Sequence, residues 1–194
     1  MKKFIVTVCA SGGGGNFQAL IDAQKEIGFE INGLVVDREC GAITRAVKAK
    51  IPVKNINCLS PSFEDDFDNC ISPETNLVVL AGFMPIVPRN VCEKWSGKII
   101  NTHPSLLPKF GGRGMFGVRV QEAVMNSGEK NAGCTIHFVN DKIDEGEILL
   151  QKSIEIDYSD TPWQLGKKIF LQENILLVEA VRLLRLRTTL VDPL

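Results

Sequence analysis

The chain has 194 residues, of which 44% are hydrophobic and 23% are charged, and its formal net charge is −1. These values are ordinary for a globular protein and exclude an intrinsically disordered chain. They also give no electrostatic basis for binding nucleic acid or an anionic membrane, so any phosphate must be held locally. The length suits one sizeable core, and we expect a single domain over residues 1–194.

The six cysteines are scattered, with no Cys-x-x-Cys pair and no cluster with histidine that would bind zinc. We therefore expect free thiols, a reducing compartment and no metal. Residues 1–8 combine lysines with an apolar run, as signal peptides do, but the run breaks at Ser11 and continues into the pattern of a fold. A buried strand explains this segment better, and we expect a cytoplasmic protein.

The first half of the chain alternates strand and helix patterns. Strands are expected at 4–10, 31–37, 51–53 and 77–84, and helices at 17–23, 42–50, 62–71 and 88–95. The strands are nearly continuous apolar runs, typical of parallel strands that are buried on both faces. We therefore predict an α/β fold with an open, mostly parallel twisted sheet, helices on both faces, and a ligand site at the carboxyl ends of the strands.

A glycine-rich loop, Ser-Gly-Gly-Gly-Gly-Asn at 11–16, follows the first strand and precedes a helix. This arrangement presents backbone N–H groups and the positive end of a helix to a phosphate. The spacing is neither that of a Rossmann fingerprint nor that of a P-loop, because no Gly-Lys-Ser/Thr follows. Two alternatives remain: a turn without a ligand, and a dinucleotide-binding module in which Asp37, at the end of the second strand, binds a ribose.

The predicted strand at 99–103 carries the most informative polar residues, Asn101 and His103. Residues i and i+2 of a strand point to the same face, so the amide and the imidazole can converge on one volume. Together they offer hydrogen-bond donors and a group that titrates near neutral pH. Prolines at 104 and 108 stiffen the segment that follows. The alternative is a structural histidine bonded to the backbone.

The second half contains a glycine-rich loop at 109–117 and a carboxylate-rich loop at 140–146 that includes Asp144. The first loop can approach a ligand closely or form a mobile lid. A helix is expected at 118–127, strands at 133–139 and 148–156, and a last helix at 161–187 with an apolar stripe formed by Leu165, Ile169, Ile175, Leu176, Val178 and Leu183.

The combination of an amide, an imidazole and a carboxylate fits acyl transfer best. Two donors can stabilise an oxyanion, and a histidine paired with Asp144 can move a proton from an attacking amine. No serine or cysteine is placed beside His103 as a nucleophile, so a covalent acyl-enzyme has little support. The alternative for Asp144 is a carboxylate that is simply solvated in its loop.

Four segments together resemble the folate-dependent formyltransferases. They are 11–20, 80–84, 101–108 and 137–146, and the string Asn-Thr-His-Pro-Ser-Leu-Leu-Pro at 101–108 is the most specific. The glycine loop that continues as Asn-Phe-Gln resembles the phosphoribosylglycinamide formyltransferase branch. The resemblance implies direct transfer of a formyl group from 10-formyltetrahydrofolate, a co-substrate, to the amine of glycinamide ribonucleotide in purine biosynthesis, without a metal.

The resemblance also implies roles for individual residues. Asn101, His103 and Asp144 would be catalytic; substrate binding would involve Gly14, Gly15 and Asn16 at the phosphate together with Glu173; and the folate would contact Met84, Pro85, Ile86, Val87, Asn101, Asn140 and Asp141. A cis peptide bond is expected at Leu107-Pro108. The partners would be small molecules alone, with no nucleic acid and no membrane, and the enzyme a monomer or homodimer.

The sequence departs from the family pattern at several positions. Gly15 stands where Ser or Thr is usual, Pro85 where many members have Arg, and Asn174 where His is common, while 63–68 lacks an Arg that often reaches the folate carboxylate. We expect these departures to affect the affinity for the folate more than the chemistry. A formyltransferase acting on another amine, such as an aminoacyl-tRNA or a sugar nucleotide, is an alternative, although the near-neutral charge argues against tRNA. A hydrolase that releases formate would use similar residues.

Overall fold

The computed structural model describes residues 3–191, with side chains placed up to residue 188. A seven-stranded sheet in the order β3-β2-β1-β4-β5-β6-β7 forms its centre. The strands are β1 (Phe4–Ala10), β2 (Phe29–Val36), β3 (Val53–Asn55), β4 (Leu77–Leu80), β5 (Ile99–His103), β6 (Asn131–Phe138) and β7 (Ile148–Glu155). The helices are α1 (Gly15–Ile27), α2 (Gly41–Ala49), α3 (Phe63–Cys70), α4 (Arg89–Lys94), α5 (Val118–Asn126) and α6 (Pro162–Val191).

Strands β1 to β5 pair in parallel, whereas β6 and β7 are antiparallel to their neighbours. The predicted open, mostly parallel sheet is therefore confirmed. The chain leaves β1 toward β2 and β3 on one side and returns to β4 on the other, so the strand order reverses between β1 and β4. Such a reversal leaves a crevice at the carboxyl ends of the strands, where ligands bind.

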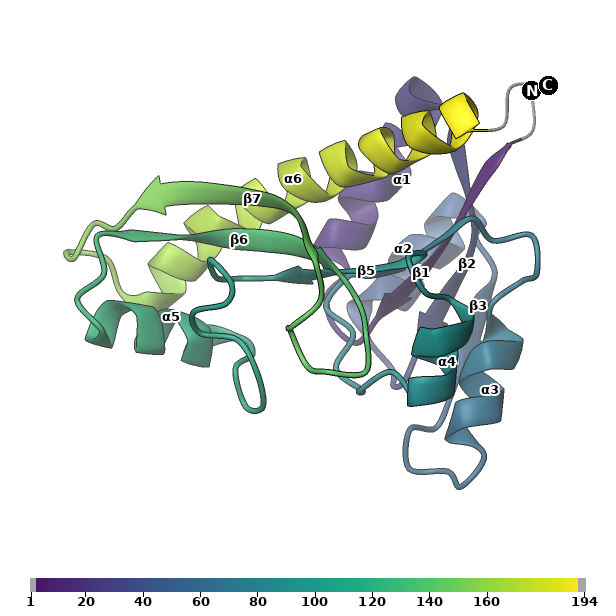
Figure 1. Ribbon diagram of the computed structural model, residues 1–194, viewed down its shortest axis with the longest axis horizontal. Helices are drawn as coiled ribbons and strands as arrows, with labels where there is room; N and C mark the ends of the chain where they lie inside the picture. Colours follow the sequence, from purple (N-terminus) through teal and green to yellow (C-terminus); the bar gives the residue numbers. More distant parts are fainter. Residues whose placement is uncertain (1–2, 192–194) are drawn as a thin grey trace.

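Helices cover both faces of the sheet (Figure 1), with α1 and α6 packed together on one face and α3 and α4 on the other. Alternate residues of each strand supply the two cores. In β4, for example, Val79 packs with the core that contains Phe17 of α1, while Val78 and Leu80 pack with the core that contains Phe67 of α3. A third core lies between α5, α6 and β6.

Two local expectations are wrong. The strand expected at 77–84 ends at Leu80, because the chain turns at Gly82, which has a left-handed φ of 74°, and there becomes a wall of the cleft. Ile175 does not belong to the buried stripe of α6, since 66% of it is exposed; the buried positions include Leu165, Ile169, Leu177 and Val181. Their spacing of four and eight residues runs along one face of the helix.

No helix in the described part of the chain is long and apolar enough to cross a membrane. All six cysteines carry free thiols. The peptide bond Leu107-Pro108 is cis, as the resemblance to the formyltransferases implied.

Candidate active site

A cleft of about 570 Å³ opens at the carboxyl ends of β1, β4 and β5, beside the strand-order reversal. Its volume is in the range of small-molecule sites. All the residues to which the resemblance to the formyltransferases gave a role line this one cleft: Gly14, Gly15, Asn16, Met84, Pro85, Ile86, Val87, Asn101, His103, Asn140, Asp141, Asp144 and Glu173. The fold thus brings together five segments that are far apart in the sequence.

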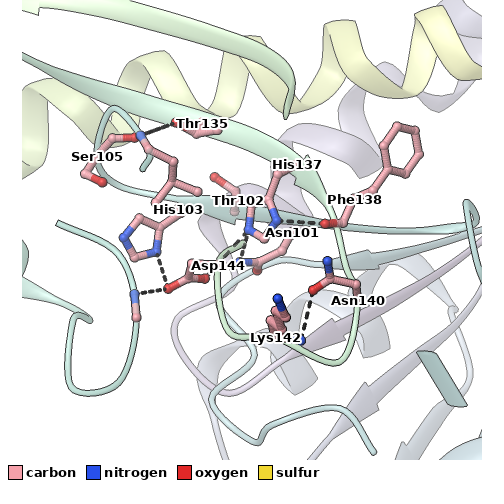
Figure 2. Close-up of polar contacts among 12 residues, drawn as sticks. Asn101, Thr102, His103, Ser105, Thr135, His137, Phe138, Asn140, Lys142 and Asp144 are labelled. Carbon is pink, nitrogen blue, oxygen red and sulfur yellow. Dashed lines mark hydrogen bonds and ion pairs between the residues drawn. The ribbon is translucent and has the colours of Figure 1, made fainter. Parts of the chain in front are cut away.

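Strand β5 delivers Asn101 and His103 to the same side of the sheet, as predicted from their spacing. The antiparallel register of β5 and β6 places His137 directly opposite Asn101. The Asn101 Nδ2 lies 3.1 Å from His137 Nε2 (Figure 2). The orientation of the Asn101 amide is therefore set by a second histidine that the sequence analysis did not place in the site.

His103 is only 4% exposed, and both of its ring nitrogens face protein groups. Nε2 lies 2.9 Å from the Phe110 carbonyl, and Nδ1 lies 3.5 Å from an Asp144 carboxylate oxygen. Because a carbonyl only accepts, Nε2 must carry the hydrogen. In this tautomer Nδ1 carries the lone pair of the ring, and it faces the Asp144 carboxylate. The structural alternative is partly right, since the ring is bonded to backbone, but its other nitrogen faces the cleft.

The Asp144 carboxylate lies between the two imidazoles (Figure 2). Oδ2 accepts a hydrogen bond of 2.9 Å from the Gly112 backbone N–H, and Oδ1 lies 3.7 Å from His137 Nε2. The side chain is 12% exposed, so it is not a solvated loop carboxylate. Gly112 belongs to the 109–117 loop, and Asp144 therefore joins the two loops that border the cleft.

His137 is a neutral imidazole that acts as a hydrogen-bond acceptor toward Asn101. Burial lowers its pKa, and this effect outweighs the opposing influence of the Phe138 carbonyl and of Asp144. Nδ1–H donates to the Phe138 carbonyl over 2.9 Å, which leaves a lone pair on Nε2. The Asn101 Nδ2 can donate one hydrogen to this lone pair and retain its second for a ligand.

The glycine loop between β1 and α1 turns its carbonyl groups away from the cleft. The Gly12 carbonyl accepts from the Ala42 N–H over 3.1 Å, and the Gly13 carbonyl accepts from Arg45 Nε over 2.8 Å. The N–H groups in the first turn of α1 have no partner within the helix, and they carry the positive end of its dipole. This end of the cleft therefore suits an anion, and the buried Asn16 side chain lies beside it.

Glu173 is the buried carboxyl group at the same end of the cleft. It is 7% exposed and accepts a hydrogen bond of 2.6 Å from the Thr102 hydroxyl. Burial raises the pKa of Glu173 to about 7, although the Thr102 hydroxyl favours the ionised form. Glu173 lies within the buried face of α6, between Ile169 and Leu177, which explains its low exposure.

The opposite end of the cleft is mainly apolar. Met84 and Ile86 are 47% and 58% exposed there, so both present apolar surface to a ligand. The 140–146 loop closes this end, and the Asn140 side chain braces the loop by accepting from the Lys142 N–H over 2.9 Å. Within residues 3–191, no group of three or more His, Cys, Asp or Glu is arranged to hold a metal ion.

His137 and Phe170 are among the cleft residues that were not predicted from the sequence to belong to the site. His137 is one of only two histidines in the chain, which was a signal, but its position depends on strand register. Asp37, the residue of the dinucleotide alternative, does not line the cleft. Its side chain is 1% exposed and pairs with Arg38 at 2.8 Å, so it is not available to a ribose.

Comparisons with known proteins agree with this geometry. Residues 2–181 match the formyl transferase family. The chloroplastic phosphoribosylglycinamide formyltransferase of Arabidopsis thaliana is 34% identical over 93% of this chain and 64% of its own length. The trifunctional purine biosynthetic protein adenosine-3 of Bos taurus is 36% identical over 94% of this chain and 18% of its own length. The chain thus spans less than two thirds of these relatives.

Solved structures show the same fold. The phosphoribosylglycinamide formyltransferase of Coxiella burnetii has a TM-score of 0.85 and 33% identity, covering 93% of this chain and 86% of that one. A formyltetrahydrofolate deformylase from Pseudomonas putida has a TM-score of 0.78 and 26% identity, covering 92% of this chain and 64% of that one. On the match over residues 2–181, which is most of its length, this chain belongs to the formyl transferase family.

Proposed function

We propose that this chain is a phosphoribosylglycinamide formyltransferase, which transfers the formyl group of 10-formyltetrahydrofolate to the amine of glycinamide ribonucleotide in purine biosynthesis. The observation that carries the proposal is the convergence of Asn101, His103 and Asp144 midway between an anion site and an apolar pocket in one cleft. The names of the Arabidopsis and Coxiella relatives point to the same reaction.

Two ends of the cleft suit the two substrates. The ribonucleotide phosphate would bind the N–H groups of Gly14, Gly15 and Asn16, with Glu173 contacting the rest of that substrate. The pterin of the folate would bind along residues 84–87, opposite Asn140 and Asp141. A flat heterocycle with a few polar edges fits a pocket that combines exposed apolar side chains with backbone groups.

The residues between the two ends would carry out the transfer. The folate supplies the formyl group, and the amine of the ribonucleotide attacks its carbon directly. Asn101 Nδ2 and the protonated Nδ1 of His103 would stabilise the negative charge that develops on the formyl oxygen. The new C–N bond forms at the amine, the bond to the folate nitrogen breaks, and the proton lost by the amine is returned to that nitrogen with His103 as the carrier.

Asp144 and His137 would act on these two groups rather than on the substrate. The Asp144 carboxylate, 3.5 Å from Nδ1, would stabilise positive charge that develops on the His103 ring during the transfer. His137, as a neutral acceptor at 3.1 Å, holds the Asn101 amide with its nitrogen toward the reaction centre. Hydrogen-bond donors that are already held in position stabilise a transition state more than mobile donors do.

The proposal is tested by incubating the purified chain with 10-formyltetrahydrofolate and glycinamide ribonucleotide and measuring formylated ribonucleotide and released folate together. Equal amounts of both products are expected. Formate release without ribonucleotide would instead favour a deformylase, the activity named for the Pseudomonas putida structure. Omitting the ribonucleotide and offering other amines serve as controls. We further propose a cytoplasmic monomer or homodimer that acts on small molecules only.

A further inference from the structure

Phe170 has no role in the reaction outlined above, yet it lines the cleft. It lies on α6, is 38% exposed, and also lines a neighbouring apolar groove of about 610 Å³ that includes Trp163 and Leu171. Phe170 precedes Glu173 by three residues, so both lie on the same side of the helix. Its ring therefore forms a wall between the ribonucleotide end of the cleft and the groove.

The ring reaches across to the first residue of α1. A Cβ atom at Gly15 would lie 2.9 Å from Phe170 Cε1 and closer still to Cζ. Real Cβ atoms do not approach other heavy atoms so closely, so a side chain at position 15 and the ring in this position exclude each other. The backbone gives no such restriction, because Gly15 begins a regular helix and does not adopt a left-handed φ.

The neighbouring Gly14 provides the contrast. Its φ is 72°, and a Cβ atom there would lie 2.8 Å from the Ala42 backbone. Glycine at position 14 is thus required by the backbone and by α2, whereas glycine at position 15 is required only by Phe170. Glycine is therefore needed at these two consecutive positions for different physical reasons.

Building on the proposed function, we infer that Phe170 is a specificity-determining residue of the ribonucleotide site. Its ring takes the space in which a side chain at position 15 would offer a hydroxyl to the phosphate. The phosphate is left to backbone N–H groups, and the ring presents an apolar face to the carbon skeleton of the attached sugar. The ligand class is thus a sugar phosphate. Its phosphate binds to backbone N–H groups, and its sugar fits against the apolar face of the Phe170 ring.

A double-mutant cycle between Gly15→Ser and Phe170→Ala tests the pairing. Binding of glycinamide ribonucleotide is measured by calorimetry without folate, so that the cycle does not depend on the chemical step, and kcat and KM are measured alongside. Gly15→Ser alone should weaken binding by roughly tenfold, because the hydroxyl and the ring crowd each other. Phe170→Ala alone should weaken binding by about fivefold through lost apolar contact.

In the Phe170→Ala background, Gly15→Ser should no longer harm and should tighten binding by roughly threefold to tenfold, since its hydroxyl can donate to the charged phosphate. Gly15→Ala in both backgrounds separates the effect of bulk from that of the hydroxyl. In wild type the added methyl group should crowd the Phe170 ring and weaken binding. In the Phe170→Ala background it should not tighten binding, because it has no hydroxyl. The KM for glycinamide ribonucleotide should follow the measured affinity, and it should change more than the KM for folate in every variant. Leu171→Ala, at the exposed neighbouring position on α6, is the matched control and should leave binding unchanged.

Effects of Gly15→Ser that are the same in both backgrounds, in folded proteins, would overturn the inference. So would an equal rise in the KM values of both substrates. Failure of the proposed function is a separate outcome. In that case the wild-type protein would bind the ribonucleotide but would not formylate it. Wild-type protein that does not bind the ribonucleotide would overturn both.

Discussion

Replacing Asp144 by Asn tests the electrostatic centre of the site. The carboxylate is 3.5 Å from His103 Nδ1, and the two side chains are 12% and 5% exposed. At this separation, opposite unit charges in a protein environment with an effective dielectric constant of about 20 attract each other by roughly 5 kcal/mol. If the charged pair contributes to the transition state, most of this attraction is lost in the variant. Some 3–5 kcal/mol corresponds to a decrease in kcat of roughly 10² to 10⁴.

The substitution is well matched to the structure. Asp144 has a left-handed φ of 58°, which Asn also adopts readily. The Asn carbonyl oxygen can still accept the hydrogen bond from the Gly112 N–H that Oδ2 accepts at 2.9 Å. We therefore expect a folded protein whose KM values for both substrates change by less than about fivefold, while kcat falls.

The assay is steady-state formylation of glycinamide ribonucleotide, with urea unfolding as a check on folding. Glu145→Gln is the control from the same loop, because the Glu145 side chain is 65% exposed and lies 3.7 Å from Lys142. Such an exposed pair contributes little, and kcat should remain within about twofold. A folded Asp144→Asn protein with a kcat within a few fold of wild type would refute the electrostatic role.

Three further predictions concern other parts of the cleft. His103→Ala and Asn101→Ala should each lower kcat by on the order of 10² or more, and the double variant should lose less than the product, since both serve one transition state; multiplicative losses would argue against this. A Cβ at Gly13 meets no atom within 4 Å, so Gly13→Asp should fold and raise the KM for the ribonucleotide by roughly tenfold through repulsion of the phosphate, whereas Gly13→Asn should not. Burial raises the pKa of Glu173 from 4.5 to about 7, so between these values the unfolded chain ionises while the native protein stays protonated, and wild-type stability falls as pH rises. Relative to wild type, Glu173→Gln should therefore gain about 3 kcal/mol in the free energy of unfolding between pH 4 and pH 8, measured in urea, and a pH-independent difference would contradict the burial argument.

The parts of the fold that follow from local periodicity could be predicted from the sequence. Apolar runs define the parallel strands, and the two-residue spacing of Asn101 and His103 puts both side chains in the cleft. The buried face of α6 was harder to predict. Ile175 is apolar, as core residues usually are, but it lies on the exposed side of the helix, while the charged residue Glu173 lies on the buried side. Charge and apolarity are poor guides to burial when a helix borders a ligand site.

The position of His137 could not be predicted from local pattern. It reaches Asn101 only because β6 pairs with β5 in one register, and the two residues are 36 apart in the chain. A shift of one residue would turn His137 to the opposite face of the sheet. The contact between Gly15 and Phe170 could not be predicted from local pattern either, because it joins the first and last helices. Contacts of this kind are fixed by tertiary packing rather than by any single segment.

The two groups that hold His103 are both carried by residues with a left-handed backbone conformation. Phe110, whose carbonyl faces Nε2, and Asp144, whose carboxylate faces Nδ1, each have a φ of 58°. A left-handed conformation is unfavourable for a bulky residue such as Phe, and it persists only where the surrounding structure compensates for the cost. Here the compensation includes the hydrogen bond from the Gly112 N–H to Asp144, which links the two loops. Folding thus fixes both ring nitrogens of His103 before a substrate arrives, and that prior orientation is what an electrostatic role in the transfer requires.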